Sequence, residues 1–249
     1  MRLESKLICG DCLEIIPTLP RVKMIFADPP DNLGIKYVGF KDKIKNDRYL
    51  DWLLDVVHAG CKYSDTFWLS YNQRWDQPVS SFFVGVVGIR RKFIWHYTFG
   101  QNQKTDFVSS YRPIIRNITP GAIQYPDAVH VPSARQLKYN DKRANPKGKM
   151  PDDVWNYPRV CGTFKERKKW HPCQHPKELL KRMVLFSTKP GDTVVDMFAG
   201  SGNMFEVCKE LDRVCIGVDI SMQYCEQIAD EQGLKIEDRS LNECKEMSN

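Results

Sequence analysis

The chain has 249 residues, a length that suits one α/β domain with an insertion better than two full domains, and 42% of them are hydrophobic, enough for a substantial core. It contains no apolar run of signal-peptide or membrane-spanning length, so we expect a cytoplasmic protein without a membrane partner. The nine cysteines are odd in number and scattered, which favours reduced thiols over a disulfide framework.

The net charge of +6 is concentrated in the middle of the chain. Residues 101–182 contain 17 Lys and Arg against 7 Asp and Glu, whereas the remainder contains 20 against 24. A basic middle in an otherwise slightly acidic protein indicates a polyanionic partner such as a nucleic acid, although a solvated surface without a partner has the same composition.

Strands and helices alternate in the first part of the chain. The apolar run at 22–27 predicts a buried strand, which must end at Pro29 and Pro30 because proline cannot continue the hydrogen-bonded ladder. The predicted order is strand 6–9, helix 11–16, strand 22–27, an amphipathic helix around residues 50–61, and strands 66–71 and 92–98.

From residue 132 to 170 the periodicity fails, and Lys, Arg, Asn, Pro and Gly dominate. A long irregular segment inside a compact domain is usually functional or disordered. Regular structure returns with a helix that begins at Pro176, followed by strand 193–197, helix 203–211, strand 214–218, helix 221–231 and a polar tail after residue 236. This alternation predicts a mostly parallel, doubly wound α/β sheet, whose ligands bind at the carboxyl ends of the strands.

A turn with two glycines separates the strand at 193–197 from the next helix. Gly200 and Gly202 allow the backbone to approach a ligand closely, whereas Phe205 stands where a dinucleotide-binding fingerprint has its third glycine. Asp219 ends the following strand, where a carboxylate accepts hydrogen bonds from both ribose hydroxyls. The pattern favours an adenosine ligand without a phosphate chain, and a plain turn is the alternative.

Three motifs together resemble those of the amino-methylating DNA methyltransferases. Residues 195–202, V-D-M-F-A-G-S-G, resemble the D-x-F-x-G-x-G signature of that family. Residues 28–30 match the start of its catalytic D-P-P-Y motif, and residues 171–176, H-P-C-Q-H-P, are similar to its H-P-x-Q-x-P. The catalytic motif precedes the basic segment and the cofactor motif, which is the permuted order of the β class, and the resemblance extends from about Leu7 to Ile228.

This resemblance implies a Rossmann-like S-adenosylmethionine-dependent methyltransferase fold with circularly permuted motif order. Its parts are a catalytic half at 1–130, a basic target-recognition insertion at 131–170, a cofactor-binding half of the same domain at 171–235, and a polar tail at 236–249. The implied reaction is site-specific methyl transfer from S-adenosylmethionine to adenine N6 in DNA, with the target base flipped out of the duplex.

The resemblance also implies roles for individual residues, and it implies no metal. Asp28 and the backbone carbonyl of Pro29, followed by Pro30, are expected to accept hydrogen bonds from the target amine. The expected cofactor residues are Asp11, Asp28, His171, Gln174, Asp196, Phe198, Ala199, Gly200, Ser201, Gly202 and Asp219. The expected DNA contacts are Arg135, Lys138, Lys142, Arg143, Lys147 and Lys149.

One position departs from the family pattern. An aromatic residue that stacks on the target base normally follows the two prolines, and here that position is Asp31. Tyr37 is a candidate to replace it if the intervening loop folds back. Of the tryptophans, Trp52 is expected in the core, and Trp155 in the basic segment is a candidate for contact with DNA.

Three alternatives remain open at this point. A cytosine-N4 enzyme shares the chemistry but more often has Ser in place of Asp28, and a catalytically inactive DNA-binding relative accounts for Asp31. A nicotinamide oxidoreductase leaves residues 28–30 without a role. Family analogy makes a homodimer and a cognate restriction endonuclease plausible partners, and the sequence itself identifies neither.

Overall fold

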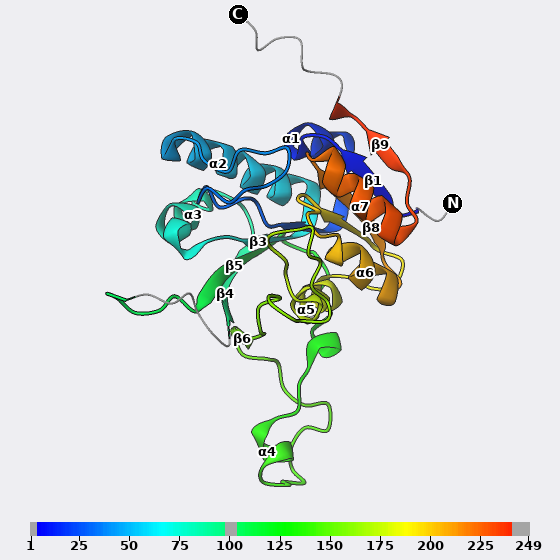
Figure 1. The fold of residues 1–249 in the computed structure, drawn as a ribbon. Helices are drawn as coiled ribbons and strands as arrows, with labels where there is room; N and C mark the ends of the chain where they lie inside the picture. The colour runs from blue at the N-terminus through cyan, green and yellow to red at the C-terminus, as the bar shows by residue number, and fades with distance from the viewer. Residues whose placement is uncertain (1–3, 98–103, 241–249) are drawn as a thin grey trace, which may run out of the picture.

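The computed structural model describes residues 4–97 and 104–240, in which strands form one sheet of order β6-β4-β5-β3-β2-β7-β8-β1-β9 (Figure 1). Neighbouring strands pair in parallel throughout, except that β5 runs antiparallel to β3 and β4. The strands are β1 Lys6–Cys9, β2 Val22–Ala27, β3 Ser64–Ser70, β4 Ile89–His96, β5 Tyr111–Ile118, β6 Val154–Asn156, β7 Thr193–Asp196, β8 Val214–Asp219 and β9 Ile236–Asp238.

Helices cover both faces of this sheet. One hydrophobic cluster joins one face of the strands to α5, α6 and α7, and a second joins the other face to α1, α2 and α3. The helices are α1 Cys12–Ile15, α2 Asn46–Tyr63, α3 Asp76–Phe82, α4 Ala134–Leu137, α5 Lys177–Ser187, α6 Asn203–Glu210 and α7 Met222–Gln232, with 3-10 turns at Ile16–Thr18, Gln73–Trp75 and Pro126–Val129. The prediction of a doubly wound, mostly parallel sheet is confirmed.

The central strand β2 shows why the sequence folds this way. Met24 and Phe26 belong to the cluster under α5 and α6, whereas Ile25 and Ala27 belong to the cluster under α2. Because successive side chains point to opposite faces, a strand covered on both sides must be apolar at nearly every position.

Some elements were not predicted. Strand β5 contains Arg112, Arg116 and Asn117, so it lacks the continuous apolar character of the other buried strands. Strand β4 begins at Ile89, earlier than expected, and Thr98 of the predicted strand lies outside the described residues. Residues 236–238, expected at the start of a polar tail, pair with β1 as β9.

The expected insertion is partly built into the body of the protein. Strand β6 pairs with β4, and its Trp155 is 4% exposed between Trp68 and Phe93. The candidate role of Trp155 in contacting DNA is therefore wrong, because the indole is part of the core.

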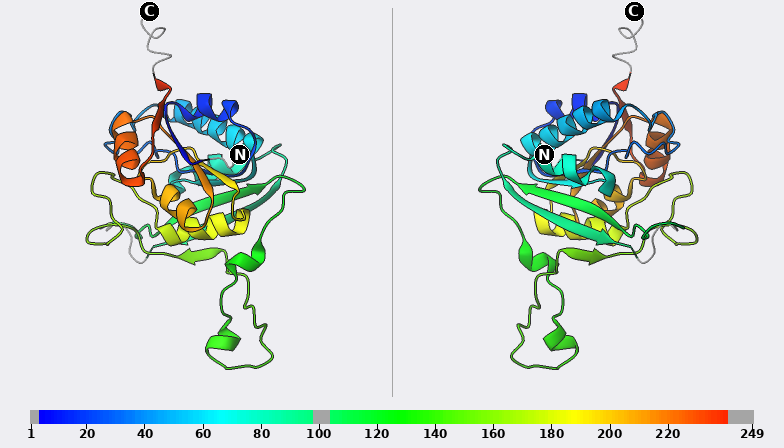
Figure 2. Two further views of the ribbon diagram at one scale, coloured as in Figure 1. Left: turned by 90° about the vertical axis from the view of Figure 1, so that its right-hand side faces the viewer. Right: turned by 90° about the vertical axis from the view of Figure 1, so that its left-hand side faces the viewer.

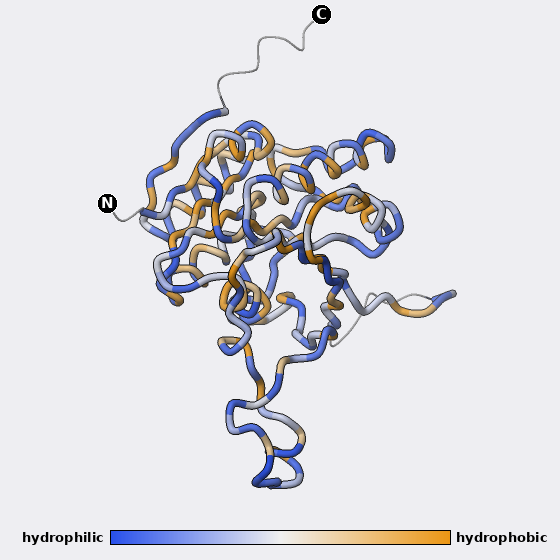
Figure 3. Tube along the Cα trace, turned by 180° about the vertical axis from the view of Figure 1, so that it is seen from behind, coloured by the Kyte–Doolittle hydropathy of each residue, from blue (hydrophilic) through white to orange (hydrophobic). Residues whose placement is uncertain are grey.

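Only residues 131–149 of that segment project from the body, as a basic protrusion that carries α4 (Figures 1 and 2). Reciprocal backbone hydrogen bonds between Val131 and Lys149 close its base. It contains six Lys and Arg and one Asp, and its tube is mostly hydrophilic (Figure 3). It leaves the body beside the edge strand β6 and its neighbour β4 (Figure 1).

Within the described range, no helix is long and apolar enough to cross a membrane. The eight cysteines in that range are all free thiols, as expected, and Cys244 lies outside it.

Phe205 stands where the third glycine is missing, and its ring packs directly against Gly217 of β8. A Cβ at Gly217 would lie 2.4 Å from the Phe205 ring. We expect Gly217→Ala to lower the free energy of unfolding by about 1–3 kcal/mol through overpacking. Urea unfolding measures this change. Phe205→Leu should lower the free energy of unfolding less in the Gly217→Ala background than in the wild-type protein. Additive losses would contradict the packing argument.

Candidate active site

A cavity opens at the carboxyl ends of the central parallel strands, where ligands of doubly wound sheets bind. The space within it, including the part open to solvent, is about 990 Å³. Its walls come from the segments after β1, β2, β7 and β8, from the loop between β2 and α2, and from the segment before α5.

The turn between β7 and α6 forms one wall. Gly200 adopts a left-handed φ of 49°, and a Cβ there would lie 3.1 Å from the ring of His171. The Gly200 N–H donates to Asp219 Oδ2 at 2.8 Å, and the Ser221 N–H donates to Oδ1 at 2.9 Å. The carboxyl group at the end of β8 therefore fixes the glycine turn, and Asp219 also lines the cavity.

The cavity is acidic. Its walls carry four carboxyl groups, and no Lys or Arg of the described ranges 4–97 and 104–240 lines it: the acids are Asp11, Asp28, Asp196 and Asp219. Burial raises the pKa of Asp219 and holds that of Asp196 well above its usual range. Even with Asp196 neutral, a lining of carboxyl groups without Lys or Arg favours a ligand with positive charge over a pyrophosphate, which needs cationic or backbone donors.

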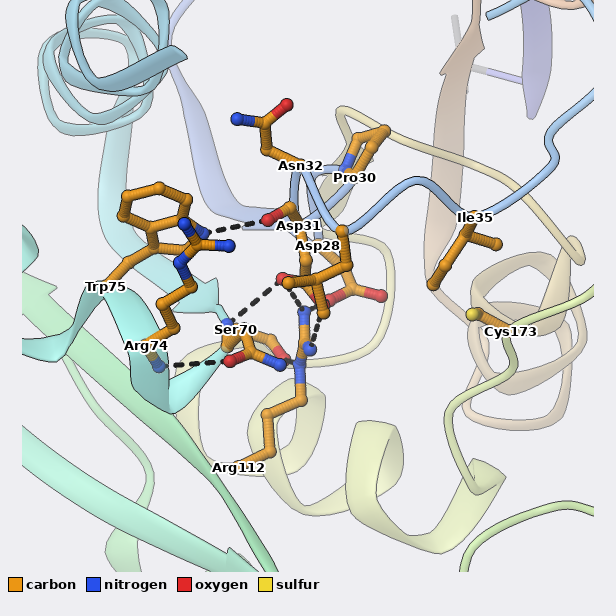
Figure 4. A network of polar contacts seen from close by, with 12 residues as sticks. Asp28, Pro30, Asp31, Asn32, Ile35, Ser70, Arg74, Trp75, Arg112 and Cys173 are labelled. Atoms are coloured by element: carbon orange, nitrogen blue, oxygen red, sulfur yellow. Dashed lines mark hydrogen bonds and ion pairs between the residues drawn. The ribbon is translucent and has the colours of Figure 1, made fainter. Parts of the chain in front are cut away.

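Asp28 follows β2 and lies beside Arg112 (Figure 4), and both of its carboxylate oxygens have partners. Arg112 of β5 donates to Oδ1 at 2.7 Å, and the ring of His175 lies 3.1 Å from Oδ2. Burial alone would raise the pKa of Asp28, but the opposing effects of His175 and Arg112 prevail and lower it below its usual range. The group is therefore an ionised acceptor at the cavity wall.

Asp31 points to the same arginine. Arg112 donates to Asp31 Oδ2 at 2.6 Å and to Oδ1 at 3.0 Å, and the Asn72 N–H also donates to Oδ1. Burial raises the pKa of Asp31, although Arg112 opposes this. Burial would lower the pKa of Arg112, but the two carboxylates raise it well above its usual range.

The loop between β2 and α2 folds back over the cavity. The Asp42 carboxylate accepts backbone N–H groups from Asn32, Leu33 and Ile35, which fixes the loop. The Val38 N–H donates to the Tyr224 hydroxyl at 3.1 Å, so the loop is tied to α7 across the cavity mouth.

This loop brings Tyr37 to the cavity wall beside His171. Their ring centroids are 6.0 Å apart, and the Tyr37 hydroxyl lies 3.5 Å from Cys173 Sγ. Burial lowers the pKa of His171 to about 4, so this imidazole is neutral at physiological pH.

Most of the expected site residues line this one cavity. They are Asp11, Asp28, Pro30, Tyr37, His171, Asp196, Phe198, Ala199, Gly200, Ser201 and Asp219. The catalytic motif and the glycine turn, about 170 residues apart in sequence, therefore share one pocket.

The remaining expected residues do not line it. Gln174 uses its amide to hold Glu166 and Lys168, so it anchors the preceding segment. Gly202, with φ of 72°, is the N-cap residue that precedes α6, and it lies against Ile228. Pro29 is buried, and Asp31 faces Arg112.

Sequence reasoning missed three polar side chains at the site: Ser70, Arg112 and His175. Arg112 lies 84 residues from Asp28, in a strand that was not predicted, and no local motif identifies it. His175 was only part of the matched H-P-x-Q-x-P. Trp52, expected in the core, lines the cavity.

None of the six basic residues expected to bind DNA lines the cavity. All six are exposed on the basic protrusion, where Arg143 pairs with Asp141, Lys147 with Asp127, and Lys149 with Asp152. In residues 4–97 and 104–240, no group of three or more His, Cys, Asp or Glu side chains is placed to hold a metal ion.

Comparison with known proteins identifies the family. The N6_N4_Mtase family, described as DNA methylase, matches residues 22–230, so the chain belongs to this family. It is 33% identical over 239 residues to the DNA adenine methyltransferase YhdJ of Escherichia coli (strain K12), covering 89% of this chain and 80% of the relative. It is 29% identical over 233 residues to the type II methyltransferase M.HpaI of Haemophilus parainfluenzae, covering 90% and 73%.

Solved structures share the fold at low sequence identity. A complex of M1.HpyAVI with SAM superposes with a TM-score of 0.63 at 20% identity, covering 92% of this chain and 99% of that one. The cytosine-N4-specific PvuII DNA methyltransferase gives 0.67 at 14% identity, covering 96% of both chains. The predicted methyltransferase fold is thus confirmed.

The buried Asp196 makes stability depend on pH. The pKa of Asp196 is raised in the folded chain. Its contribution to the free energy of unfolding is therefore fully present below the pKa of the unfolded state, about 4, and is lost as the pH rises through the pKa of the folded state. Asp196→Asn keeps an acceptor for the Phe198 N–H. We expect the free energy of unfolding of the variant to rise relative to that of wild type as the pH increases. The full difference is about 1.4 kcal/mol for each pH unit by which the pKa of Asp196 in the folded state exceeds that in the unfolded state.

Urea unfolding between pH 5 and 8 measures this difference. Asp230→Asn, on the exposed surface of α7, is the matched control and should follow the wild-type curve. A difference for Asp196→Asn that stays flat or falls with pH would show that this carboxyl is not buried in its neutral form.

Proposed function

From its membership of this DNA methylase family, we propose that the chain transfers a methyl group from S-adenosylmethionine to the N6 amine of adenine at specific sites in DNA. The observation that carries the proposal is the single cavity shared by Asp28 and the turn from Phe198 to Gly200. The similarity to YhdJ, named a DNA adenine methyltransferase, supports adenine as the target base.

The residues of the cavity fit S-adenosylmethionine. This cofactor carries a positively charged sulfur and an adenosine without phosphates, and it supplies an activated methyl group when bound. The cavity lining contains four carboxyl groups and, among the described residues, no Lys or Arg, which suits the positive charge of the cofactor, and Phe198, Trp52 and Met197 offer apolar surface. Asp219 is the proposed acceptor for the ribose hydroxyls, and the Gly200 turn allows close backbone approach.

Asp28 performs the central task in the proposed mechanism. The lone pair of an exocyclic amine is delocalised into the ring, so the nitrogen is a poor nucleophile. The Asp28 carboxylate and the Pro29 carbonyl accept the two amine hydrogens and favour a tetrahedral nitrogen. They also stabilise the positive charge that develops on it, which is electrostatic catalysis. The walls of the cavity supply alignment, which is positional catalysis.

The target base must leave the duplex to reach Asp28, at a cost of a few kcal/mol. Tyr37 stands at the cavity wall, on the loop that continues from residues 28–30, and its ring is the proposed stacking surface for the flipped base. Asp31 does not take this part, because its side chain is 10% exposed and held by Arg112.

The basic protrusion is the proposed contact to the DNA backbone. It carries six basic residues and a single acid, and none of them lines the cavity. A duplex held there and at the cavity would extend across the side of the protein, and phosphate contacts fix its register. The chain would then act in the cytoplasm, where a homodimer and a cognate restriction endonuclease are further proposed partners.

The deciding experiment incubates the protein with DNA and S-adenosylmethionine and analyses the nucleosides by mass spectrometry. We expect N6-methyladenine at defined sites, whereas N4-methylcytosine would replace the adenine assignment. Asp28→Ala should retain cofactor binding within about threefold and lose methyl transfer by about 10³-fold or more, because an acceptor used in the transition state is removed. Full turnover by this variant would overturn the chemistry assigned to Asp28.

DNA binding should depend on the protrusion and on salt. We expect the double variant Lys138→Gln/Lys142→Gln to bind DNA more weakly and to reduce the slope of log affinity against log salt by about 1.8, for two phosphate contacts. Lys209→Gln/Lys235→Gln, exposed elsewhere, is the control. Equal slopes for both double variants, measured by fluorescence anisotropy, would remove the protrusion from the interface.

A further inference from the structure

We infer that Asp31 and Arg112 form a positioning pair that fixes the Asp28 carboxylate at the cavity wall, and that this is the role of Asp31 at the position where an aromatic residue is expected after the two prolines. The inference rests on the proposed function, because it assigns Asp28 its catalytic part. It gives a role to the one position at which the catalytic motif departs from its family pattern.

Arg112 is the centre of the arrangement (Figure 4). Its side chain is 12% exposed, and its donors go to three side chains: Nη2 to Asp28, both terminal nitrogens to Asp31, and Nε to Ser70 Oγ at 2.7 Å. A planar guanidinium with several fixed partners holds each of them in one orientation.

Hydrogen-bond directions close a ring around Asp28. Because Arg112 Nε only donates, Ser70 Oγ accepts there, and its own proton is free for His175 Nε2 at 2.9 Å. The other nitrogen of His175 then donates to Asp28 Oδ2, opposite the oxygen that Arg112 holds. Each carboxylate oxygen is thus fixed from one side and keeps a lone pair for the target amine.

Asp31 is the rigid end of the pair. Its carboxylate accepts from the Asn72 N–H at 3.0 Å, and its carbonyl accepts from Trp75 Nε1 at 2.8 Å, so the side chain and backbone are both anchored. An aromatic ring at position 31 would leave Arg112 buried with Asp28 as its only carboxylate. It would also have to fit a site that is 7% exposed and lies behind the cavity wall.

The titratable and charged groups that interact electrostatically with Asp28 come from every surrounding element. They are Asp31, Tyr37, Tyr49, Tyr97, Arg112, His171, Cys173, His175 and Asp196. Of these, His175 and Arg112 lower the pKa of Asp28 against its burial. Loss of Arg112 therefore raises that pKa, and the acid limb of the rate profile moves to higher pH.

The test compares wild type with Arg112→Gln, Arg112→Lys, Asp31→Asn and Asp31→Tyr, with Arg116→Gln as matched control. Arg116 lies on the same strand and face as Arg112 but stacks on Phe186 and Trp68. We expect Arg112→Gln to lower kcat about 10²-fold while KM for S-adenosylmethionine changes less than about threefold, because Asp28 is misplaced and cofactor contacts remain. In the pH–rate profile of Arg112→Gln, the fall in rate on the acid side moves to higher pH. Arg112→Lys returns this acid limb toward its wild-type position more fully than it restores kcat.

Asp31→Tyr separates the two interpretations of this position. The positioning pair predicts a loss of kcat similar to that of Arg112→Gln, whereas a missing base platform predicts a gain. A gain, or an Arg112→Gln profile that matches Arg116→Gln in kcat and acid limb, would overturn the inference.

A double-mutant cycle on the melting temperature needs no activity. If the pair exists, Asp31→Asn lowers the melting temperature of wild type but lowers it less, or raises it, in the Arg112→Gln background. Additive losses would overturn the pair even in an active enzyme. If instead the two substitutions are coupled in melting temperature but the wild-type protein transfers no methyl group, the proposed function is rejected. The pairing of Asp31 with Arg112 then stands as a structural interaction alone.

Discussion

The pairing of β2 with β7 is the constraint on which the site depends. These strands are far apart in sequence, yet Phe26 and Asp196 are register partners at their carboxyl ends. Parallel pairing places the residues that follow each strand at the same edge of the sheet. The acceptor Asp28 and the glycine turn therefore meet in one cavity whatever the order of the two motifs along the chain. A permuted motif order is thus compatible with the same arrangement of the site.

Burial of charge then decides what each side chain does. Asp28, half-buried at the cavity wall, and Asp31, buried, are close in sequence, but the pKa of Asp28 is lowered and that of Asp31 is raised. The difference follows from their partners, since Asp28 receives both Arg112 and His175 whereas Asp31 faces Arg112 and the like charge of Asp28. A carboxylate that stays ionised beside a cavity is a better acceptor for an amine, and the structure reserves that state for the residue that the motif places at the strand end.

How far the sequence predicts this arrangement depends on how local each signal is. The strand at 22–27, Asp28 and the Gly200 turn were predicted because periodicity and motif lie within a few neighbouring residues. Strand β5 was missed because Arg112 and Arg116 interrupt its apolar pattern, and their burial is tolerated only through partners on other elements. The predicted fold therefore holds where one segment carries its own signal. The role of Asp31 could not be found, because Arg112 comes from a strand 81 residues away.

Charge of opposite sign is also divided between two regions. The cavity gathers four carboxyl groups, and the basic protrusion carries six Lys and Arg beside a single Asp. A cationic cofactor and a polyanionic substrate would each be attracted to its own region and repelled from the other. With both signs mixed around the cavity, phosphates would compete for its donors. Because the two regions are separate, only an uncharged base has reason to enter the acidic cavity, while the phosphates stay outside. The proposed base flipping would follow from this division, since the duplex backbone would remain with the basic surface while a single base crosses to Asp28.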